Sequence, residues 1–289
     1  MAGILRLLVA ESESPEQRDA RRASVDRSSG ETFLKTMAEI APGASLDRAK
    51  PSDSPADIPG RTELAGYDAV ILTGSPMHLY RETPETRRQI EFMRAVFASG
   101  TPAFGSCAGL QVATVAAGGT VRPGRRGAEA PFARNLAATQ AGKAHPLLSG
   151  RPERFDAPAI HSDEVDALPE GALLLASNDH TEVQAAEIRV GEGVFWGVQY
   201  HPELSLGEVA AAIRRQAEDL VEKGALQSRQ AVDEEAALIE RLDRDGGDKE
   251  AAALLGLDAE VIDLDLRRRE LRNFIEKLVL PTRSRRARG

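Results

Sequence analysis

The sequence predicts an α/β fold, in which a mostly parallel sheet is flanked by helices and followed by a helical C-terminal extension. Three observations support this prediction. Short apolar stretches alternate with segments of helical periodicity over the first two hundred residues. In the stretch DAVILTG, residues 68–74, the hydrophobic residues are continuous rather than alternating, which is typical of a strand buried on both faces of a parallel sheet. Beyond about Gly207, strand patterns disappear and helical spacing remains.

The elements of the α/β part follow one another in a regular order. The expected strands are short and rich in apolar and β-branched residues: 4–10, 67–74, 101–107, 173–178 and 194–200. The expected helices are 31–40, 84–99 and 110–119, and the last of them ends at the paired glycines Gly118 and Gly119. Residues 41–60 are dense in Pro, Ser and Asp and predict a loop, and the charged residues 12–30 predict a long first loop.

The chain therefore divides into residues 1–206 and a helical extension, residues 207–289. The extension is rich in Ala, Leu, Glu and Arg at helical spacing, with a break at Gly246 and Gly247. Two roles are compatible with amphipathic helices of this kind. They pack on the α/β body, or they bind a partner, which includes a second copy of the chain in a homo-oligomer.

Composition excludes several classes of protein. The net charge of -8 argues against general affinity for nucleic acid, and no apolar run is long enough to cross a bilayer. The first apolar stretch is too short for the core of a signal peptide, so we expect a cytoplasmic protein. A single cysteine excludes an internal disulfide, and scattered histidines offer no metal spacing, so we expect neither a metal nor a cofactor.

The lone cysteine lies in GSCAG, residues 105–109, between an expected strand and an expected helix. This is the spacing of a nucleophile elbow, in which glycines two positions on either side prevent collisions with the adjoining strand and helix. Cys107 is then exposed at the carboxyl end of the sheet as a nucleophile. A small buried cysteine at a tight turn is the alternative interpretation of this motif alone.

A second motif, VQYHPE, places His201 and Glu203 directly after an apolar strand. An imidazole beside Cys107 would take the thiol proton and return it to the leaving group, while Glu203 would orient the ring and stabilise its cation. The two motifs together predict a Cys107, His201 and Glu203 triad.

A third motif, LTGSP, follows the expected strand 67–74 with small residues. The backbone N–H groups of Gly74 and Ser75, together with that of Ala108 after the nucleophile, would form an oxyanion hole for a tetrahedral intermediate. An ordinary β-turn is equally compatible with a Ser-Pro pair.

The motifs ILTGSP, PAFGSCAGLQ, HSDEV and VFWGVQYHPE occur in the order and approximate spacing of class I glutamine amidotransferases. The sequence most resembles the GMP-synthetase-like group of that family, over about residues 4–206. The resemblance implies a flavodoxin-like fold and hydrolysis of L-glutamine to glutamate and ammonia through a γ-glutamyl thioester. It also implies that Cys107, His201 and Glu203 are the triad.

The resemblance further implies which residues hold the substrate. Gln111 and the backbone near Ser162 and Asp163 would bind glutamine, and His161 in HSDEV matches the pattern near the glutamine pocket. A structural hydrogen-bonding role for His161 and Asp163 is an alternative. The sequence departs from the family at Ser75, where a second glycine is usual, and a positive φ there would strain the backbone.

Several functions remain open at this stage. The sequence contains neither a G-x-x-x-x-G-K-[ST] loop nor an S-G-G-x-D-S loop, so ATP-dependent activation of an ammonia acceptor is expected on a separate synthetase partner. A stand-alone hydrolase of γ-glutamyl amines or peptides would use the same thioester chemistry. A non-catalytic module that senses glutamine is a third alternative, although the complete triad argues against it.

Overall fold

The strands of the molecule form one large sheet and one small one. The computed structural model describes residues 4–53 and 58–286. Its strands are β1 Arg6–Ala10, β2 Ser45–Ala49, β3 Ala69–Leu72, β4 Ala103–Ser106, β5 Thr120–Pro123, β6 Phe132–Ala138, β7 Arg154–Pro158, β8 Asp163–Ala167, β9 Leu173–Ser177, β10 Ala185–Val190 and β11 Gly193–Val198. The large sheet has the order β2-β1-β3-β4-β11-β10-β9-β6-β7, and β5 pairs with β8 separately.

The large sheet is parallel in one half and antiparallel in the other. Strands β2, β1, β3, β4 and β11 are parallel neighbours. The neighbours from β11 through β10, β9 and β6 to β7 are antiparallel. The α/β prediction is confirmed, and the parallel half aligns the carboxyl ends of β3, β4 and β11 at one edge, where ligands bind in open α/β sheets.

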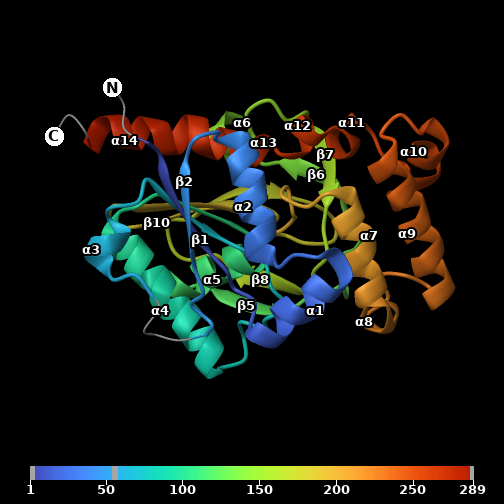
Figure 1. The fold of residues 1–289 in the computed structure, drawn as a ribbon, viewed down its shortest axis with the longest axis horizontal. Coiled ribbons are helices and arrows are strands. Elements are labelled where there is room, and N and C mark those ends of the chain that lie inside the picture. The colour runs from blue at the N-terminus through green and yellow to red at the C-terminus, as the bar shows by residue number, and fades with distance from the viewer. Residues whose placement is uncertain (1–3, 54–57, 287–289) are drawn as a thin grey trace.

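Helices cover both faces of this sheet (Figure 1). The helices that precede β7 in the chain are α1 Pro15–Val25, α2 Ser29–Ile40, α3 Arg61–Leu64, α4 Pro84–Ser99, α5 Ala108–Ala116 and α6 Gln140–Ala144. Those that follow β11 are α7 Leu206–Arg215, α8 Ala217–Glu222, α9 Arg229–Arg244, α10 Lys249–Leu255, α11 Ala259–Ile262, α12 Leu264–Arg267, α13 Arg269–Phe274 and α14 Leu280–Arg286, with a π-helical turn at Ile275–Val279 between the last two.

Strand β1 shows why the central strands are apolar without interruption. Leu7 belongs to a buried cluster with Phe33 of α2 on one face of the sheet, and Leu8 belongs to another with Phe92 of α4 on the opposite face. Because successive side chains of a strand point to opposite faces, a strand covered on both sides needs apolar residues at every position.

The C-terminal helices belong to the body of the molecule. Phe274 at the end of α13 lies in the same cluster as Leu7, with its ring centroid 5.6 Å from that of Phe104 and 6.3 Å from that of Trp196. The Tyr200 hydroxyl donates a hydrogen bond to Glu270 of α13 at 2.9 Å. Helix α13 and the turn after it therefore cover the face of the sheet that α2 also covers.

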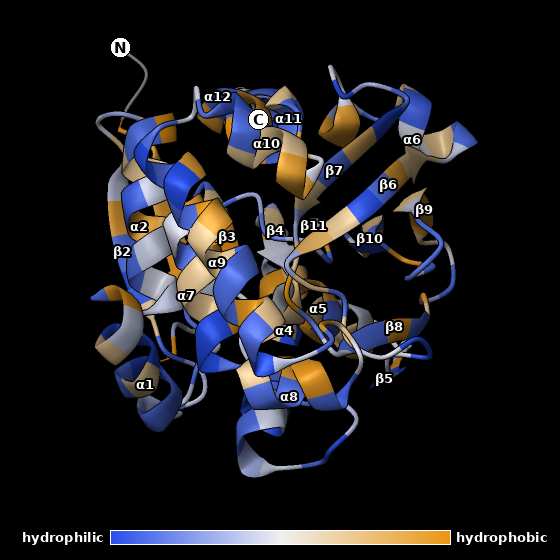
Figure 2. Ribbon diagram, turned by 90° about the vertical axis from the view of Figure 1, so that its right-hand side faces the viewer, coloured by the Kyte–Doolittle hydropathy of each residue, from blue (hydrophilic) through white to orange (hydrophobic). Residues whose placement is uncertain are grey.

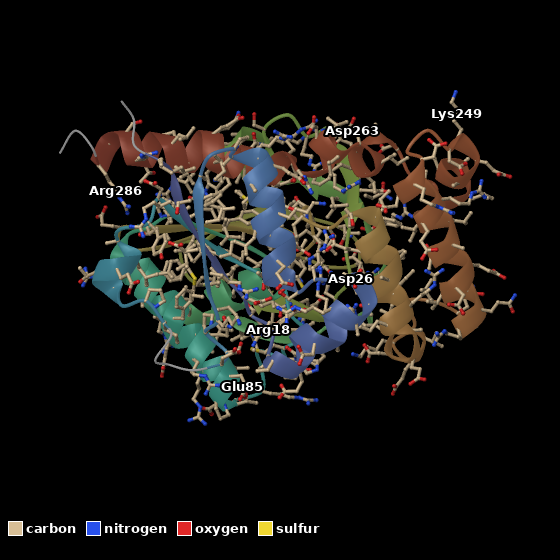
Figure 3. The ribbon with its side chains drawn as sticks, in the orientation of Figure 1. Arg18, Asp26, Glu85, Lys249, Asp263 and Arg286 are labelled. Atoms are coloured by element: carbon tan, nitrogen blue, oxygen red, sulfur yellow. The ribbon has the colours of Figure 1, made fainter. Side chains whose placement is uncertain are left out.

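The helices α7, α9 and α10 form a third buried cluster, at the right-hand end of the molecule in Figure 1. Figure 2 shows apolar and polar segments within the same helices, as expected of helices buried along one side. Lys249 of α10 projects outward at one end of the molecule, whereas Arg286 of α14 at the other end donates hydrogen bonds to Gly100 O and Tyr67 O (Figure 3). Within the residues that the structure describes, no helix combines the length and apolar character needed to cross a membrane.

Two loop predictions are wrong in part. Residues 41–60 contain β2, a half-exposed edge strand whose sequence SLDRA lacks an apolar run. Residues 12–30 contain α1, which begins with Pro15 and a capping box formed by Ser14 and Gln17. The first expected helix begins at Ser29 rather than Glu31 because Ser28 provides its cap.

Candidate functional site

Cys107 lies at the turn between β4 and α5. Its backbone has φ 51° and ψ -111°, values that residues with a side chain rarely adopt, and its N–H donates to Val198 O of β11 at 2.8 Å. Ser75 has no positive φ, so the strain considered there is instead at Cys107. The turn holds the thiol above the carboxyl ends of the parallel strands.

The glycines around Cys107 are required by close backbone approaches. A Cβ atom on Gly105 would lie 2.8 Å from the Gly109 carbonyl carbon and 2.9 Å from the Phe195 ring. A Cβ atom on Gly109 would lie 2.7 Å from Leu72 O. All three distances are shorter than a carbon side chain tolerates, so the elbow spacing follows from packing of α5 against the sheet.

His201 and Glu203 lie beside Cys107 because β11, which precedes them, is the parallel neighbour of β4. The His201 Nδ1 atom lies 2.8 Å from Glu203 Oε1, and the His201 backbone N–H donates to Pro158 O at 2.7 Å. Ser106 Oγ also donates to Glu203 Oε1 at 3.0 Å. All three predicted triad residues are buried and line the same cavity.

The charges around His201 favour its cation. Burial alone lowers the pKa of the imidazole, but the Glu203 carboxylate and the Cys107 thiolate outweigh burial and raise the pKa to about 10. A hydrogen bond with Cys107 contributes in the same direction. The arrangement therefore suits His201 as a proton donor beside Cys107.

Gly74 packs directly against this pair. A Cβ atom added at Gly74 would lie 2.8 Å from His201 Cε1 and 3.5 Å from Cys107 Cβ. The N–H of Ala108 belongs to the first turn of α5, whose N–H groups have no partner within the helix. The backbone at Gly74 and Ala108 thus lies next to Cys107, and an oxyanion hole formed by Gly74, Ser75 and Ala108 remains a prediction.

The other predicted residues form a second group, next to Cys107. Gln111 is buried, and its Nε2 donates to Asp163 O at 3.1 Å and to Gln199 Oε1 at 3.2 Å. Gln111 and Asp163 line a cavity with Ser162 and Cys107. Gln111 therefore lines this cavity and, through its hydrogen bond to Asp163 O, holds the Asp163 backbone in place.

His161 is engaged on both ring nitrogens. Its Nδ1 lies 3.0 Å from Asp163 O, and its Nε2 lies 2.9 Å from Glu129 Oε2. Glu129 in turn accepts hydrogen bonds from Asn178 and Gln184. Since both neighbours of the imidazole are acceptors, these bonds favour a structural role for His161.

His78 is a residue that the sequence pattern did not single out. Its Nδ1 lies 2.6 Å from Asp163 Oδ2, and the Tyr80 hydroxyl lies 3.2 Å from the same nitrogen. His78 therefore orients the Asp163 carboxylate at the cavity wall. Its only signal in the sequence is its position just after the LTGSP motif.

Two cavities meet at Cys107. The His201 cavity, of about 200 Å³, is lined by His201 and Glu203. The Asp163 cavity, of about 660 Å³, is lined by Gln111, Ser162 and Asp163. A substrate whose reacting carbonyl lies at the thiol can extend into both.

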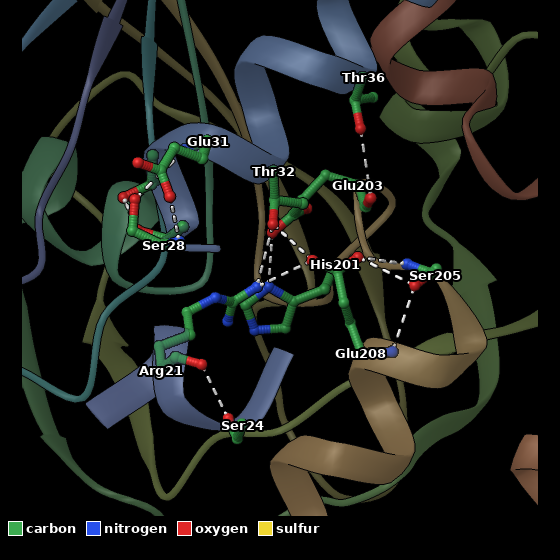
Figure 4. A network of polar contacts seen from close by, with 12 residues as sticks. Arg21, Ser24, Ser28, Glu31, Thr32, Thr36, His201, Glu203, Ser205 and Glu208 are labelled. Atoms are coloured by element: carbon green, nitrogen blue, oxygen red, sulfur yellow. Dashed lines mark hydrogen bonds and ion pairs between the residues drawn. The ribbon is translucent and has the colours of Figure 1, made fainter. Parts of the chain in front are cut away.

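The wall of the His201 cavity includes residues that sequence reasoning missed. They follow β1 or lie on the helices α1, α2 and α7: Glu13, Gln17, Arg21, Ser29, Thr32 and Arg215. Arg21, Thr32 and Glu208 form a polar network beside His201 (Figure 4). The available signal was topological, because residues after β1 lie at the same sheet edge as those after β3 and β4.

Comparison with known proteins decides the family. The family model of class I glutamine amidotransferases matches residues 46–218, which is more than half of the chain. The chain belongs to this family. The match extends into α8, beyond the strands that carry the triad residues.

Relatives of this chain have different named activities. A gamma-glutamyl-L-1-hydroxyisopropylamide hydrolase of a Pseudomonas species is 40% identical over 225 residues, or 77% of this chain and 76% of the relative. A glutamine-hydrolysing GMP synthase subunit of Methanoculleus marisnigri is 36% identical over 149 residues, or 52% of this chain and 72% of the relative. The chain matches a quarter of the whole GMP synthase of Thermomicrobium roseum, at 31% identity over 146 residues.

Solved structures share the fold. A glutamine amidotransferase from Thermotoga maritima superposes with a TM-score of 0.64 at 20% identity. The superposition covers 96% of this chain and 99% of the Thermotoga maritima chain. A glutamine amidotransferase from Methylobacillus flagellatus has a TM-score of 0.61 at 16% identity, with 94% and 96% coverage. The shared fold thus includes most of the C-terminal helices.

Proposed function

We propose that the protein hydrolyses the side-chain amide of a γ-glutamyl compound and that the released amine is larger than ammonia. Cys107 Sγ attacks the γ-carbonyl carbon, and backbone N–H groups at Gly74, Ser75 and Ala108 hold the oxyanion. His201 donates its proton to the departing nitrogen, which leaves a γ-glutamyl thioester. Water, deprotonated by His201, then attacks the thioester and releases glutamate.

The observation that supports this proposal is the His201 cavity. The proton donor to the leaving nitrogen is His201, so the leaving group has to lie on the side that His201 lines. That cavity has about 200 Å³, whereas a single water, which is close to ammonia in size, needs about 10–15 Å³. An amine with several heavy atoms fits the available space better than ammonia does.

The Asp163 cavity then takes the γ-glutamyl part of the substrate. Asp163 provides a carboxylate for the α-ammonium group, and Arg215, which lines both cavities, provides a cation for the α-carboxylate. The similarity to a γ-glutamyl amide hydrolase over three quarters of both chains supports the same assignment.

A second candidate is a glutaminase subunit that passes ammonia to a separate ATP-dependent synthetase. The similarity to the Methanoculleus marisnigri protein favours it, because that protein is one subunit of a glutamine-hydrolysing GMP synthase. The two candidates share the triad and the thioester and differ in the leaving group. A partner, and a homo-oligomer through the C-terminal helices, remain predictions.

The test is glutamate release by the purified protein from L-glutamine and from γ-glutamyl amides of short amines, with Cys107→Ala as the control. We expect kcat/KM to be higher for the substituted amides than for glutamine, and we expect no turnover in the variant. Efficient turnover of glutamine alone would favour the glutaminase. Binding without turnover of any amide would favour the sensing module and refute the proposal.

A further inference from the structure

We infer that the His201 cavity is a binding site for a neutral hydroxyl group on the leaving amine, held between Glu13 and Arg21. This inference rests on the proposed hydrolysis of γ-glutamyl amides and specifies their class. The substrate is the amide of a short amino alcohol. The site is built by the segment after β1 and by α1, at the sheet edge that carries Cys107.

Glu13 is a buried carboxylate that lines the cavity next to the triad. Its side chain is 4% exposed, and Oε2 accepts a hydrogen bond from the Ser29 N–H at 2.8 Å. In the described part of the chain, no Arg, Lys or His nitrogen lies within 4 Å of this carboxylate. Burial raises the pKa of Glu13. A buried acceptor without an ion-pair partner favours a ligand that donates a hydrogen bond to it.

Arg21 provides the complementary donor. It lines the same cavity, its side chain is 11% exposed, and it is paired with Glu208 at 3.3 Å. Its Nε atom is buried and has no hydrogen-bond partner among the described residues. Arg21 acts electrostatically on Glu13 although the two groups do not form an ion pair.

The signs of these two charges, which do not form an ion pair, favour a hydroxyl group between them. The charged atoms of Glu13 and Arg21 are more than 4 Å apart, and one oxygen that donates one hydrogen bond and accepts another bridges about 5.5 Å. A carboxylate on the amine would face Glu13, and an ammonium group would face Arg21 and Arg215. Only a group that is both donor and acceptor, and neutral, satisfies both residues.

Four substrates that differ in one group test this inference. They are γ-glutamyl-L-1-hydroxyisopropylamide and its analogues with a methyl, an ammonium or a carboxylate group in place of the hydroxyl. We expect kcat/KM of the hydroxyl compound to exceed that of each analogue by about 10- to 100-fold. Equal values for the hydroxyl and methyl compounds, or a preference for either charged analogue, would overturn the inference while the proposed hydrolysis still held.

Matched variants test whether Glu13 determines the preference for the hydroxyl compound over the methyl compound. Glu13→Gln keeps an acceptor for the Ser29 N–H, and we expect it to reduce the preference for hydroxyl over methyl by about tenfold. Glu11→Gln is the control, since Glu11 is also buried and accepts the Gly30 N–H at 2.8 Å but does not line the cavity. An unchanged preference in folded Glu13→Gln protein, or an equal loss in Glu11→Gln, would refute the assignment.

A binding measurement tests this inference independently of the proposed reaction. If no amide is hydrolysed, the proposed function fails, and calorimetric titration of Cys107→Ala protein with the same four compounds still ranks the leaving groups. Tightest binding of the hydroxyl compound supports the subsite, and equal binding of the hydroxyl and methyl compounds refutes it.

Discussion

Replacing Gly74 by alanine is expected to displace the His201 imidazole without unfolding the protein. The new Cβ atom would lie 2.8 Å from His201 Cε1, whereas carbon atoms in contact lie about 3.5 Å apart or more. The ring has to retreat by about 0.7 Å, the difference between these distances. The hydrogen bond of the ring to Glu203, and that of the His201 backbone N–H to Pro158 O, restrict that movement.

A misplacement of about 1 Å in a catalytic group lowers a rate by about 100-fold, so we expect kcat to fall by about 10- to 100-fold. Overpacking should cost about 1–3 kcal/mol of the free energy of unfolding. Gly74 has no positive φ, so alanine adds no backbone strain. The assay is kcat from glutamate release at saturating substrate, together with a urea titration.

Gly246→Ala is the matched control, because its Cβ atom would lie at an ordinary 3.5 Å from Ile262. We expect this variant to keep full activity. A Gly74→Ala protein that folds and retains the wild-type kcat would refute the reasoning that Gly74 sets the position of His201.

Three further predictions follow from the site and the core. Although burial opposes it, Glu203 raises the pKa of His201 to about 10, and the imidazolium is the proton donor. Since kcat/KM reports ionisations of the free enzyme, kcat/KM should decline only as pH passes about 10, and Glu203→Gln should shift that decline to lower pH, which a pH profile measures. His78→Phe removes the 2.6 Å contact to Asp163 and should raise KM about tenfold with little change in kcat, so an unchanged KM would contradict the role of His78. Phe274→Ala should lower the free energy of unfolding by about 3–5 kcal/mol, and a loss below about 1 kcal/mol in urea would show that α13 is peripheral.

The parallel half of the sheet could be predicted because strands that are buried on both faces have uninterrupted apolar sequences. Strand β3 is apolar at each of its four residues. Helix α4 was predicted with its observed limits because Thr83 and Pro84 provide a strong start and Gly100 provides a left-handed end. The approach of His201 to Cys107 also follows from sequence, once the two strands before them are taken as parallel neighbours.

The rest depended on tertiary packing. The amphipathic pattern of α13 predicts a buried side but not its partner, so its place against Trp196 could not be predicted. Strand β2 has little apolar character because it is an edge strand. Glu13 resembles any charged loop residue in sequence, and only the cavity beside His201 distinguishes it.

The contribution of α13 to the core has a consequence for synthesis on the ribosome. From Val198 at the end of β11 to Val279 there are 81 residues, which take about 4 to 16 s to translate at about 5–20 residues per second. During that interval the strands and α2 have emerged, but the part of the apolar sheet face that α13 covers is still exposed. The nascent chain is then a substrate for chaperones that bind exposed apolar surface, and a pause within this stretch would prolong its exposure to aggregation.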